Sequence, residues 1–208
     1  LPDNRSYRAY SDLERDFVVW NVFAAPEFSL DAREWCYPIV GCVSYRGYFS
    51  EDAANREAEK LRQKGFDVAV GGVPAYSTLG NFNDPVLNTM MRWDDVRMLS
   101  TLFHELAHQV LYIKDDTAFN ESFATAVEEI GIERWLAARG RPDDMGGYRA
   151  GKALHRVLVG LVNAAKHDLA DYYGRDIDAD TMRELKAERL EQLASDVREE
   201  LRAAGRSE

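Results

Sequence analysis

Apolar residues recur at the spacing of an α-helix throughout the second half of the chain. The first series consists of Val96, Leu99, Phe103, Leu106, Val110 and Ile113. Residues three and four apart share one helix face, so this series predicts an amphipathic helix that follows Asp94 and runs to Ile113. Asp94 and Asp95 stand where an N-cap belongs. Three further helices are predicted at about 118–138, 148–173 and 180–203, and Gly140 ends the first of these.

The first half of the chain shows the shorter patterns of strands. Three runs rich in β-branched and aromatic residues predict strands at Phe17–Phe23, Val40–Phe49 and Phe66–Val70. Between the last two, Ser50 can cap a helix that ends at Gly65. A strand–helix–strand order is typical of a right-handed crossover within one sheet. We expect Gly71–Pro74 to break or bend the last strand.

The composition indicates a folded, acidic protein. The chain has 208 residues, with 26 Lys and Arg against 36 Asp and Glu, a net charge of −10, and 46% apolar residues. This apolar content excludes a disordered chain, and the acidic balance without a basic block argues against nucleic-acid binding. The apolar runs are too short to span a membrane. Because the sequence opens at Leu1, we expect a processed or trimmed product whose export signal or lipid anchor would lie upstream.

The only two cysteines, Cys36 and Cys42, have five residues between them, in a short segment that also holds Pro38 and Gly41. Pro38 and Gly41 could supply the turn that a disulfide across so short a loop requires. Two buried free thiols fit the same spacing. A zinc knuckle would need closer spacing and a second pair of ligands.

The sequence His104-Glu105-Leu106-Ala107-His108 matches the H-E-x-x-H motif of zinc peptidases, and it lies within a predicted helix. Four residues turn a helix by about 400°, so both imidazoles lie on one face and can bind one metal ion. Glu105 lies about 100° round the helix, where it can reach a water on that metal. Burying these polar groups in an apolar helix without a partner would cost several kcal/mol. The motif therefore predicts one Zn²⁺ per chain.

A tetrahedral zinc needs a third protein ligand, and the next helix offers one. Glu121, Thr125 and Glu128 share one face of that helix. If the first helix climbs to Ile113 and the second descends antiparallel, Glu121 reaches the height of the metal, whereas Glu128 lies about 10 Å further along. We therefore predict Glu121 as the ligand, with Glu128 as its rival. The alternative for Glu121 is a favourable charge in the first helical turn.

These spacings resemble the gluzincins, the thermolysin-like zinc metallopeptidases with a glutamate as third ligand. Twelve residues separate His108 from Glu121, and nineteen separate it from Glu128, which is closer to the thermolysin spacing. Thermolysin-type sequences usually carry Asp at the position of Thr125. A closer resemblance, covering nearly the whole chain, is to a bacterial aminopeptidase family of predicted zinc proteases. It rests on strings at Val19–Pro26, Trp35–Pro38, Gly41–Phe49, Ala75–Gly80, Phe103–Gln109 and Phe119–Ala124.

The resemblance implies a Gram-negative envelope protein, periplasmic and often with a lipoprotein-type signal, which would suit a Cys36–Cys42 disulfide. For the fold, we expect one α+β, zincin-like metallopeptidase domain over 1–208. Residues 1–93 would form a mixed part with a small sheet, 94–139 the metal-binding helix pair, and 140–208 a helical part that closes the cleft. Membrane contact is expected only through an upstream lipid anchor.

The expected mechanism uses zinc held by His104, His108 and Glu121 to activate a water, with Glu105 as the general base. A second group should stabilise the oxyanion, and we predict Tyr76, because Ala75–Gly80 precedes the motif helix where zincins run an edge strand. Rivals for that role are Tyr45, Arg46, Tyr48, Tyr112 and Tyr148.

The remaining polar candidates have other expected roles. Hydrogen-bond partners of the histidine ligands could come from Asp116, Asn120 or Thr125. Glu128 could bind the free α-amine of a substrate or form a structural salt bridge. His155 and His167 lie on later predicted helices, where a surface or core position is expected.

The function predicted from these residues is hydrolysis of peptide bonds in a peptide or protein substrate by a zinc-dependent aminopeptidase, with an endopeptidase as a variant. A zincin that hydrolyses a non-peptide amide would have the same metal site. The competing hypothesis is a metal-binding envelope protein without proteolytic activity that binds a peptide or protein partner in its cleft. The intact Glu105 favours the enzyme, because a binding module has no need of a base.

Overall fold

The computed structural model describes residues 5–37, 41–75, 77–78 and 83–206. These residues form a mixed α+β structure with small sheets and a helical C-terminal half, as the sequence predicts. The chain divides into two compact units, Leu1–Trp20 with Gly72–Tyr148, and Asn21–Gly71 with Arg149–Glu208. A single zincin-like domain stays a prediction.

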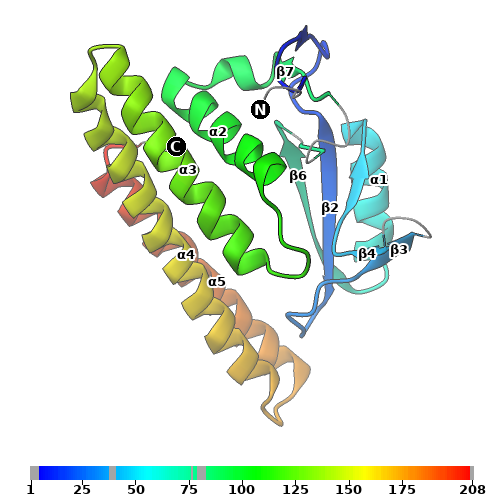
Figure 1. Cartoon of the computed structure of the whole chain (residues 1–208). Helices are drawn as coiled ribbons and strands as arrows, with labels where there is room; N and C mark the ends of the chain where they lie inside the picture. Colours follow the sequence, from blue (N-terminus) through cyan, green and yellow to red (C-terminus); the bar gives the residue numbers. More distant parts are fainter. Residues whose placement is uncertain (1–4, 38–40, 76, 79–82, 207–208) are drawn as a thin grey trace. The chain divides into compact units, whose positions relative to one another are not determined.

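The first unit is built on two long helices, α2 (Asp95–Val110) and α3 (Thr117–Ala138), which run side by side (Figure 1). Asp94 caps α2 as predicted, its side chain accepting a hydrogen bond from the backbone N–H of Arg97. The prediction that α2 extends to Ile113 is wrong, because Leu111 already has an extended backbone.

In the loop between α2 and α3, a side chain of α3 binds the backbone of a residue just after the end of α2. The Asn120 amide donates to the carbonyl of Ile113 at 2.7 Å and accepts from the N–H of Ile113 at 2.8 Å. These bonds replace helical bonds that Ile113 would otherwise make. Asp116 then caps α3 through the N–H of Phe119.

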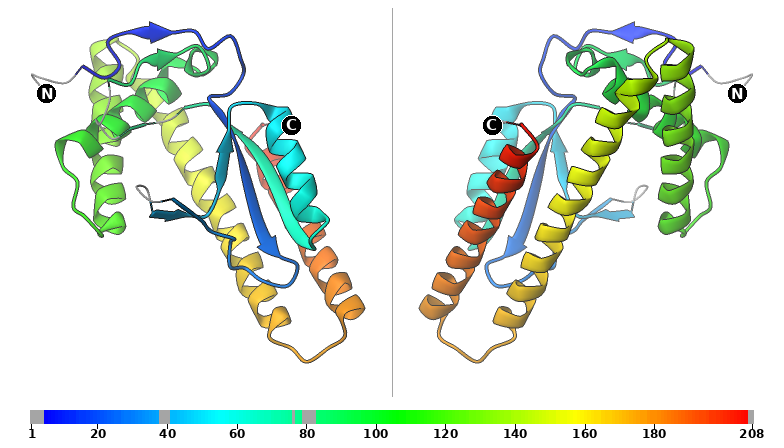
Figure 2. Two further views of the ribbon diagram at one scale, coloured as in Figure 1. Left: turned by 90° about the vertical axis from the view of Figure 1, so that its right-hand side faces the viewer. Right: turned by 90° about the vertical axis from the view of Figure 1, so that its left-hand side faces the viewer.

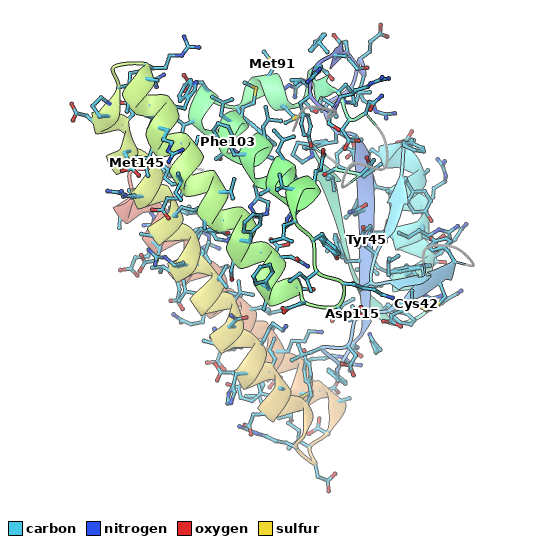
Figure 3. All side chains as sticks on the ribbon, in the orientation of Figure 1. Cys42, Tyr45, Met91, Phe103, Asp115 and Met145 are labelled. Atoms are coloured by element: carbon cyan, nitrogen blue, oxygen red, sulfur yellow. A yellow bond between two sulfur atoms is a disulfide. The ribbon has the colours of Figure 1, made fainter. Side chains whose placement is uncertain are left out.

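The core of the first unit lies where α2, α3 and the start of α4 (Met145–Tyr173) meet. Ile132, Leu136 and Met145 are buried there, and five partly buried residues pack against them: Val96, Leu99, Phe103, Trp135 and Tyr148. Figure 3 labels Phe103 and Met145 at this core. Gly131 lets the helices approach, since a Cβ there would lie 2.7 Å from the Phe103 ring. The unit also holds the 3₁₀ turns η1 (Met90–Arg92) and η2 (Pro142–Asp144), and the parallel strand pair β1 (Tyr10–Ser11) and β7 (Val86–Leu87).

The main sheet has three strands in the order β5–β2–β6, which are Arg46–Tyr48, Val19–Pro26 and Phe66–Val73. The predicted strand at 17–23 is therefore shifted, and the predicted strand at 40–49 is split in two. Its first piece, β4 (Gly41–Val43), pairs instead with β3 (Trp35–Tyr37) in a separate antiparallel pair. Cys36 and Cys42 lie opposite each other in this pair and form a disulfide.

Gly71 and Gly72 do not break the strand, because β6 continues to Val73 and ends before Pro74. The reason is a ring that packs on the glycine. A Cβ on Gly72 would lie 2.4 Å from the ring of Phe17, so glycine here makes room for an aromatic side chain. Val18 donates to the Val73 carbonyl beside it, at 2.8 Å. The alternative expectation, a bend at Gly71–Pro74, stays a prediction.

The helices of the second unit start and end close to their predicted bounds. Helix α1 (Glu51–Arg62) is capped by Ser50 and followed by Gly65 at φ +81°. Helices α4 and α5 (Ala179–Ala203) form a hairpin (Figure 2), which Arg189 joins to Asp168 at 2.7 Å. Among the described helices, none is long and apolar enough to cross a membrane.

Candidate metal centre

Two imidazoles and one carboxylate converge on the facing sides of α2 and α3. His104 and His108 lie one turn apart on α2, with ring centroids 4.9 Å from each other. Glu121, in the second turn of α3, places one carboxylate oxygen 3.2 Å from His104 Nε2 and the other 3.6 Å from His108 Nε2. One potential ligand atom from each residue lies within 4.8 Å of the other two. The three residues predicted as ligands are thus brought together.

Burial differs sharply within this cluster. The His108 side chain is 6% exposed and that of His104 is 22% exposed, whereas Glu121 is 56% exposed. The cluster therefore has a buried floor made by the histidines and an accessible side at the carboxylate.

Glu128 lies on the other side of His104. Its carboxylate lies 3.2 Å from His104 Nδ1, and its second oxygen accepts a 2.8 Å hydrogen bond from the Tyr148 hydroxyl. The side chain is 8% exposed. The hydrogen bond with Glu128 raises the pKa of His104, burial opposes this shift, and the charges of Glu105 and Glu121 support it. The pKa of Tyr148 is also raised, mainly by burial and to a lesser extent by the hydrogen bond to Glu128.

Of the roles expected for Glu128, this geometry matches the structural pairing, here with His104. The two nitrogens of an imidazole point in different directions, so Glu128 at Nδ1 cannot share an ion that His104 binds through Nε2. Its two oxygens are engaged by His104 on α2 and Tyr148 on α4, which leaves the expected binding of a substrate amine without support. A sequence signal existed, because Glu128 continues the four-residue stripe of Ala124, Ile132 and Leu136, the buried face of α3.

The partners expected for the histidines serve other purposes. Asp116 caps α3, and Asn120 holds Ile113, so neither is the histidine's hydrogen-bond partner that the sequence suggested. No hydrogen bond of Thr125 to a histidine is found among the described residues. The prediction overlooked that a partner for Nδ1 must lie on the buried face of α3, where Glu128 stands.

Glu105 lies on α2 beside the histidines, partly buried. Its charge reaches Tyr7, a residue that the sequence reasoning missed. Burial raises the pKa of Tyr7 to about 12, the charges of Glu105 and Asp84 add to this, and a hydrogen bond with Ser77 opposes it. Tyr7 has a φ of +60°, which is uncommon for a residue with a side chain. The segment is held against α2, since Gln109 contacts Ser6 at 3.5 Å.

The other candidates lie next to His108, in the second unit, or outside the described residues. Tyr76 lies outside the described residues, so its role stays a prediction. Tyr112 is exposed, with its ring centroid 6.4 Å from that of His108. The remaining rivals Tyr45, Arg46 and Tyr48, together with His155 and His167, belong to the second unit.

The donors fit a zinc ion. Two imidazole nitrogens and a carboxylate oxygen are a ligand set that zinc takes in hydrolases, with a further position left open. His108 Nδ1 is buried without a hydrogen-bond partner among the described residues, and its Nε2 faces Glu121 beyond hydrogen-bond distance. A buried imidazole with so few hydrogen bonds is costly unless another group uses its lone pair. The second cluster of potential donors among the described residues, Glu34 with Cys36 and Cys42, holds its sulfurs in the disulfide.

A family model described as "Putative aminopeptidase" matches residues 1–208. The chain belongs to this family. No curated protein and no solved structure matches it. Membership in the aminopeptidase family confirms the family resemblance and indicates a peptidase.

Proposed function

We propose that the chain is a zinc-dependent peptidase of zincin-like fold, an aminopeptidase, whose single Zn²⁺ is held by His104, His108 and Glu121. The proposal is carried by the convergence of these side chains, whose donor atoms lie within 4.8 Å of one another on α2 and α3. A bound zinc ion would supply Lewis acidity to a water molecule and to the scissile carbonyl. The chain's own residues would supply the proton transfers and the orientation.

Glu105 is the proposed general base. It accepts a proton from the attacking water on a carboxylate oxygen and delivers that proton to the leaving amine. Its place on α2 supports this, because it follows His104 directly and lies about 100° round the helix from it. In this position the carboxylate adjoins the histidines without competing for the ion.

The oxyanion of the reaction needs a hydrogen-bond donor, and two tyrosines are proposed. Tyr76 follows from the resemblance to zincins. Tyr7 is supported by the charge of Glu105, which acts on it, and by its hydroxyl, which like that of any tyrosine is protonated at neutral pH and can donate. Replacing the true donor with Phe should lower kcat by about 10²- to 10³-fold with little change in KM, and the other Tyr→Phe variant should retain activity.

The proposed setting is the bacterial cell envelope, in the periplasm and anchored by a lipid upstream of this segment. The Cys36–Cys42 disulfide supports it, because disulfides persist in oxidising compartments and are rare in a reducing cytosol.

The deciding experiment measures zinc content and peptidase activity together. Glu105→Gln should abolish hydrolysis while about one zinc per chain remains, whereas Glu121→Ala should lose the metal. Glu129→Gln is the matched control, since Glu129 is an exposed glutamate on α3 that should affect neither property. Peptides with free and blocked N-termini distinguish an aminopeptidase from an endopeptidase. Zinc binding without hydrolysis of any peptide would favour the binding protein instead, and a chain that takes no zinc would refute the proposal.

A further inference from the structure

Three side chains from three helices form a hydrogen-bonded series behind the metal centre. Tyr148, in the first turn of α4, donates to Glu128 on α3 at 2.8 Å, and Glu128 lies 3.2 Å from Nδ1 of His104 on α2. Glu128, at the middle of the series, is shielded from water, with its side chain only 8% exposed. It ends at the ring whose other nitrogen faces Glu121.

The ring of a histidine ligand has two properties that the protein must set. It must point Nε2 at the ion, and it must carry its proton on Nδ1 so that the Nε2 lone pair is available. A carboxylate beside Nδ1 accepts that proton in a hydrogen bond and so sets both the tautomer and the ring angle. It also makes the imidazole a better electron donor to the ion.

Tyr148 acts on the carboxylate rather than on the histidine. A buried carboxylate is stable only where donors satisfy its oxygens, and it can rotate about its last bond unless both are held. The Tyr148 hydroxyl binds one oxygen, so the other stays turned toward His104. Burial raises the pKa of Tyr148, and the hydroxyl keeps its proton in this place.

The two histidines are unequal in this respect. His108 Nδ1 has no hydrogen-bond partner among the described residues, and its ring is held by burial, with 6% of the side chain exposed. His104 is more exposed, at 22%, and packing restrains it less. A hydrogen-bonded support is therefore needed at His104, where Glu128 provides it.

We propose that Glu128 and Tyr148 are positioning residues that hold His104 in the orientation and tautomer that bind the metal. This role rests on the proposed function, because it requires His104 to be a ligand through Nε2. Glu128 is then a partner of the ligand and not a ligand itself.

The test is a competition titration of zinc against a chelator of known affinity, carried out on the whole chain. Glu128→Gln should weaken zinc binding by about 10- to 100-fold, and Tyr148→Phe should weaken it less. In the Glu128→Gln background, Tyr148→Phe should cause little further loss, because the tyrosine acts through the carboxylate. Glu129→Gln removes the same charge from the next position of α3 and should bind zinc like the wild type.

A second readout separates positioning from a structural role. Nitrogen NMR of the histidine rings should show the Nδ1–H form of His104 in the wild type and a loss of that preference in Glu128→Gln. Thermal unfolding of the zinc-free variants shows whether they fold. An equal zinc affinity of Glu128→Gln and the wild type, or an equal drop in Glu129→Gln, would overturn the positioning role alone. A wild-type chain that takes no zinc would instead overturn the proposed function beneath it.

Discussion

The two long helix pairs, α2–α3 and α4–α5, differ in whether they bury polar side chains. In the α4–α5 pair the buried side chains are apolar, such as Ala165, Leu169 and Met182. Arg189 on α5 pairs there with Asp168, whose side chain is 43% exposed. Between α2 and α3, by contrast, His108, Asn120 and Glu128 are all buried. Burying such groups costs free energy, so their concentration in one pair marks that pair as the one with a chemical task.

The largest expected difference between the pairs concerns histidines. Loss of a hydrogen-bond partner of a metal ligand can weaken metal binding by up to about 100-fold. His108→Ala should weaken zinc binding by more than this, because it removes a ligand itself. His167→Ala, on α4, should leave zinc binding unchanged. Zinc at 100 times its dissociation constant should stabilise the wild type by about 2.7 kcal/mol, and should not stabilise His108→Ala. Calorimetry with and without a chelator measures both effects, and a zinc-dependent shift in His108→Ala would break the distinction.

Buried amides should matter more in the α2–α3 pair. Asn120→Ala removes two hydrogen bonds to Ile113 and should cost about 1–3 kcal/mol of unfolding free energy. It should also weaken zinc binding, because Glu121 follows this residue. Gln192→Ala breaks an exposed bond to Asp196 on α5 and should cost less than about 0.5 kcal/mol. Urea denaturation compares the two, and equal losses would contradict the comparison.

Gly→Ala substitutions should change the free energy of unfolding in opposite directions in the two helix pairs. Gly131→Ala places a methyl group 2.7 Å from the Phe103 ring, and this overpacking should cost about 1–3 kcal/mol before helix propensity offsets part of it. A Cβ at Gly160 in α4 meets no atom within 4 Å. Gly160→Ala should therefore stabilise the chain by up to about 1 kcal/mol. Melting temperatures of both variants give the signs, and a stabilised Gly131→Ala would mean that α2 and α3 are loosely packed.

The smallest effect is expected at an exposed ion pair in the α2–α3 region, between Asp95 and Arg141. Arg141 holds the pKa of Asp95 below its ordinary value of 3.8, chiefly by a hydrogen bond. The stabilisation is thus present above that value and is lost as the pH falls through the lowered pKa. Asp95→Asn should lower the melting temperature slightly at pH 7, and the difference from the wild type should vanish in strong acid. A difference that grows on acidification would have the wrong sign for this pair.

Much of the helical structure follows from local patterns. Ser50, Asp94 and Asp116 cap their helices, and Gly65 and Gly140 follow them with positive φ, as the residue types favour. The strand bounds were less predictable, because strands are set by partners far away in sequence. The run at 40–49 divides because its first part pairs with β3 across the disulfide.

The candidate centre is also predictable in part. The spacing of His104 and His108 places both rings on one face of any helix, so their meeting needs no tertiary contact. Glu121 was predicted from an antiparallel return of the chain, and it lies at the cluster even though α2 ends three residues early. The Asn120–Ile113 hydrogen bonds hold the loop in which the chain turns back, and no local sequence pattern predicts them.

The sequence by itself determined the H-E-x-x-H face and the helix caps, because each depends on residues within a turn or two of one another. Only the tertiary structure decided that Glu128 faces Nδ1 of His104 while Glu121 faces Nε2. It also decided that Tyr148 completes the series and that Tyr7 lies near the charge of Glu105. On one helix face Glu121 and Glu128 are equivalent by period. The loop between α2 and α3 and the packing of these helices place the two glutamates at different nitrogens of His104, and this difference in position gives them different proposed roles.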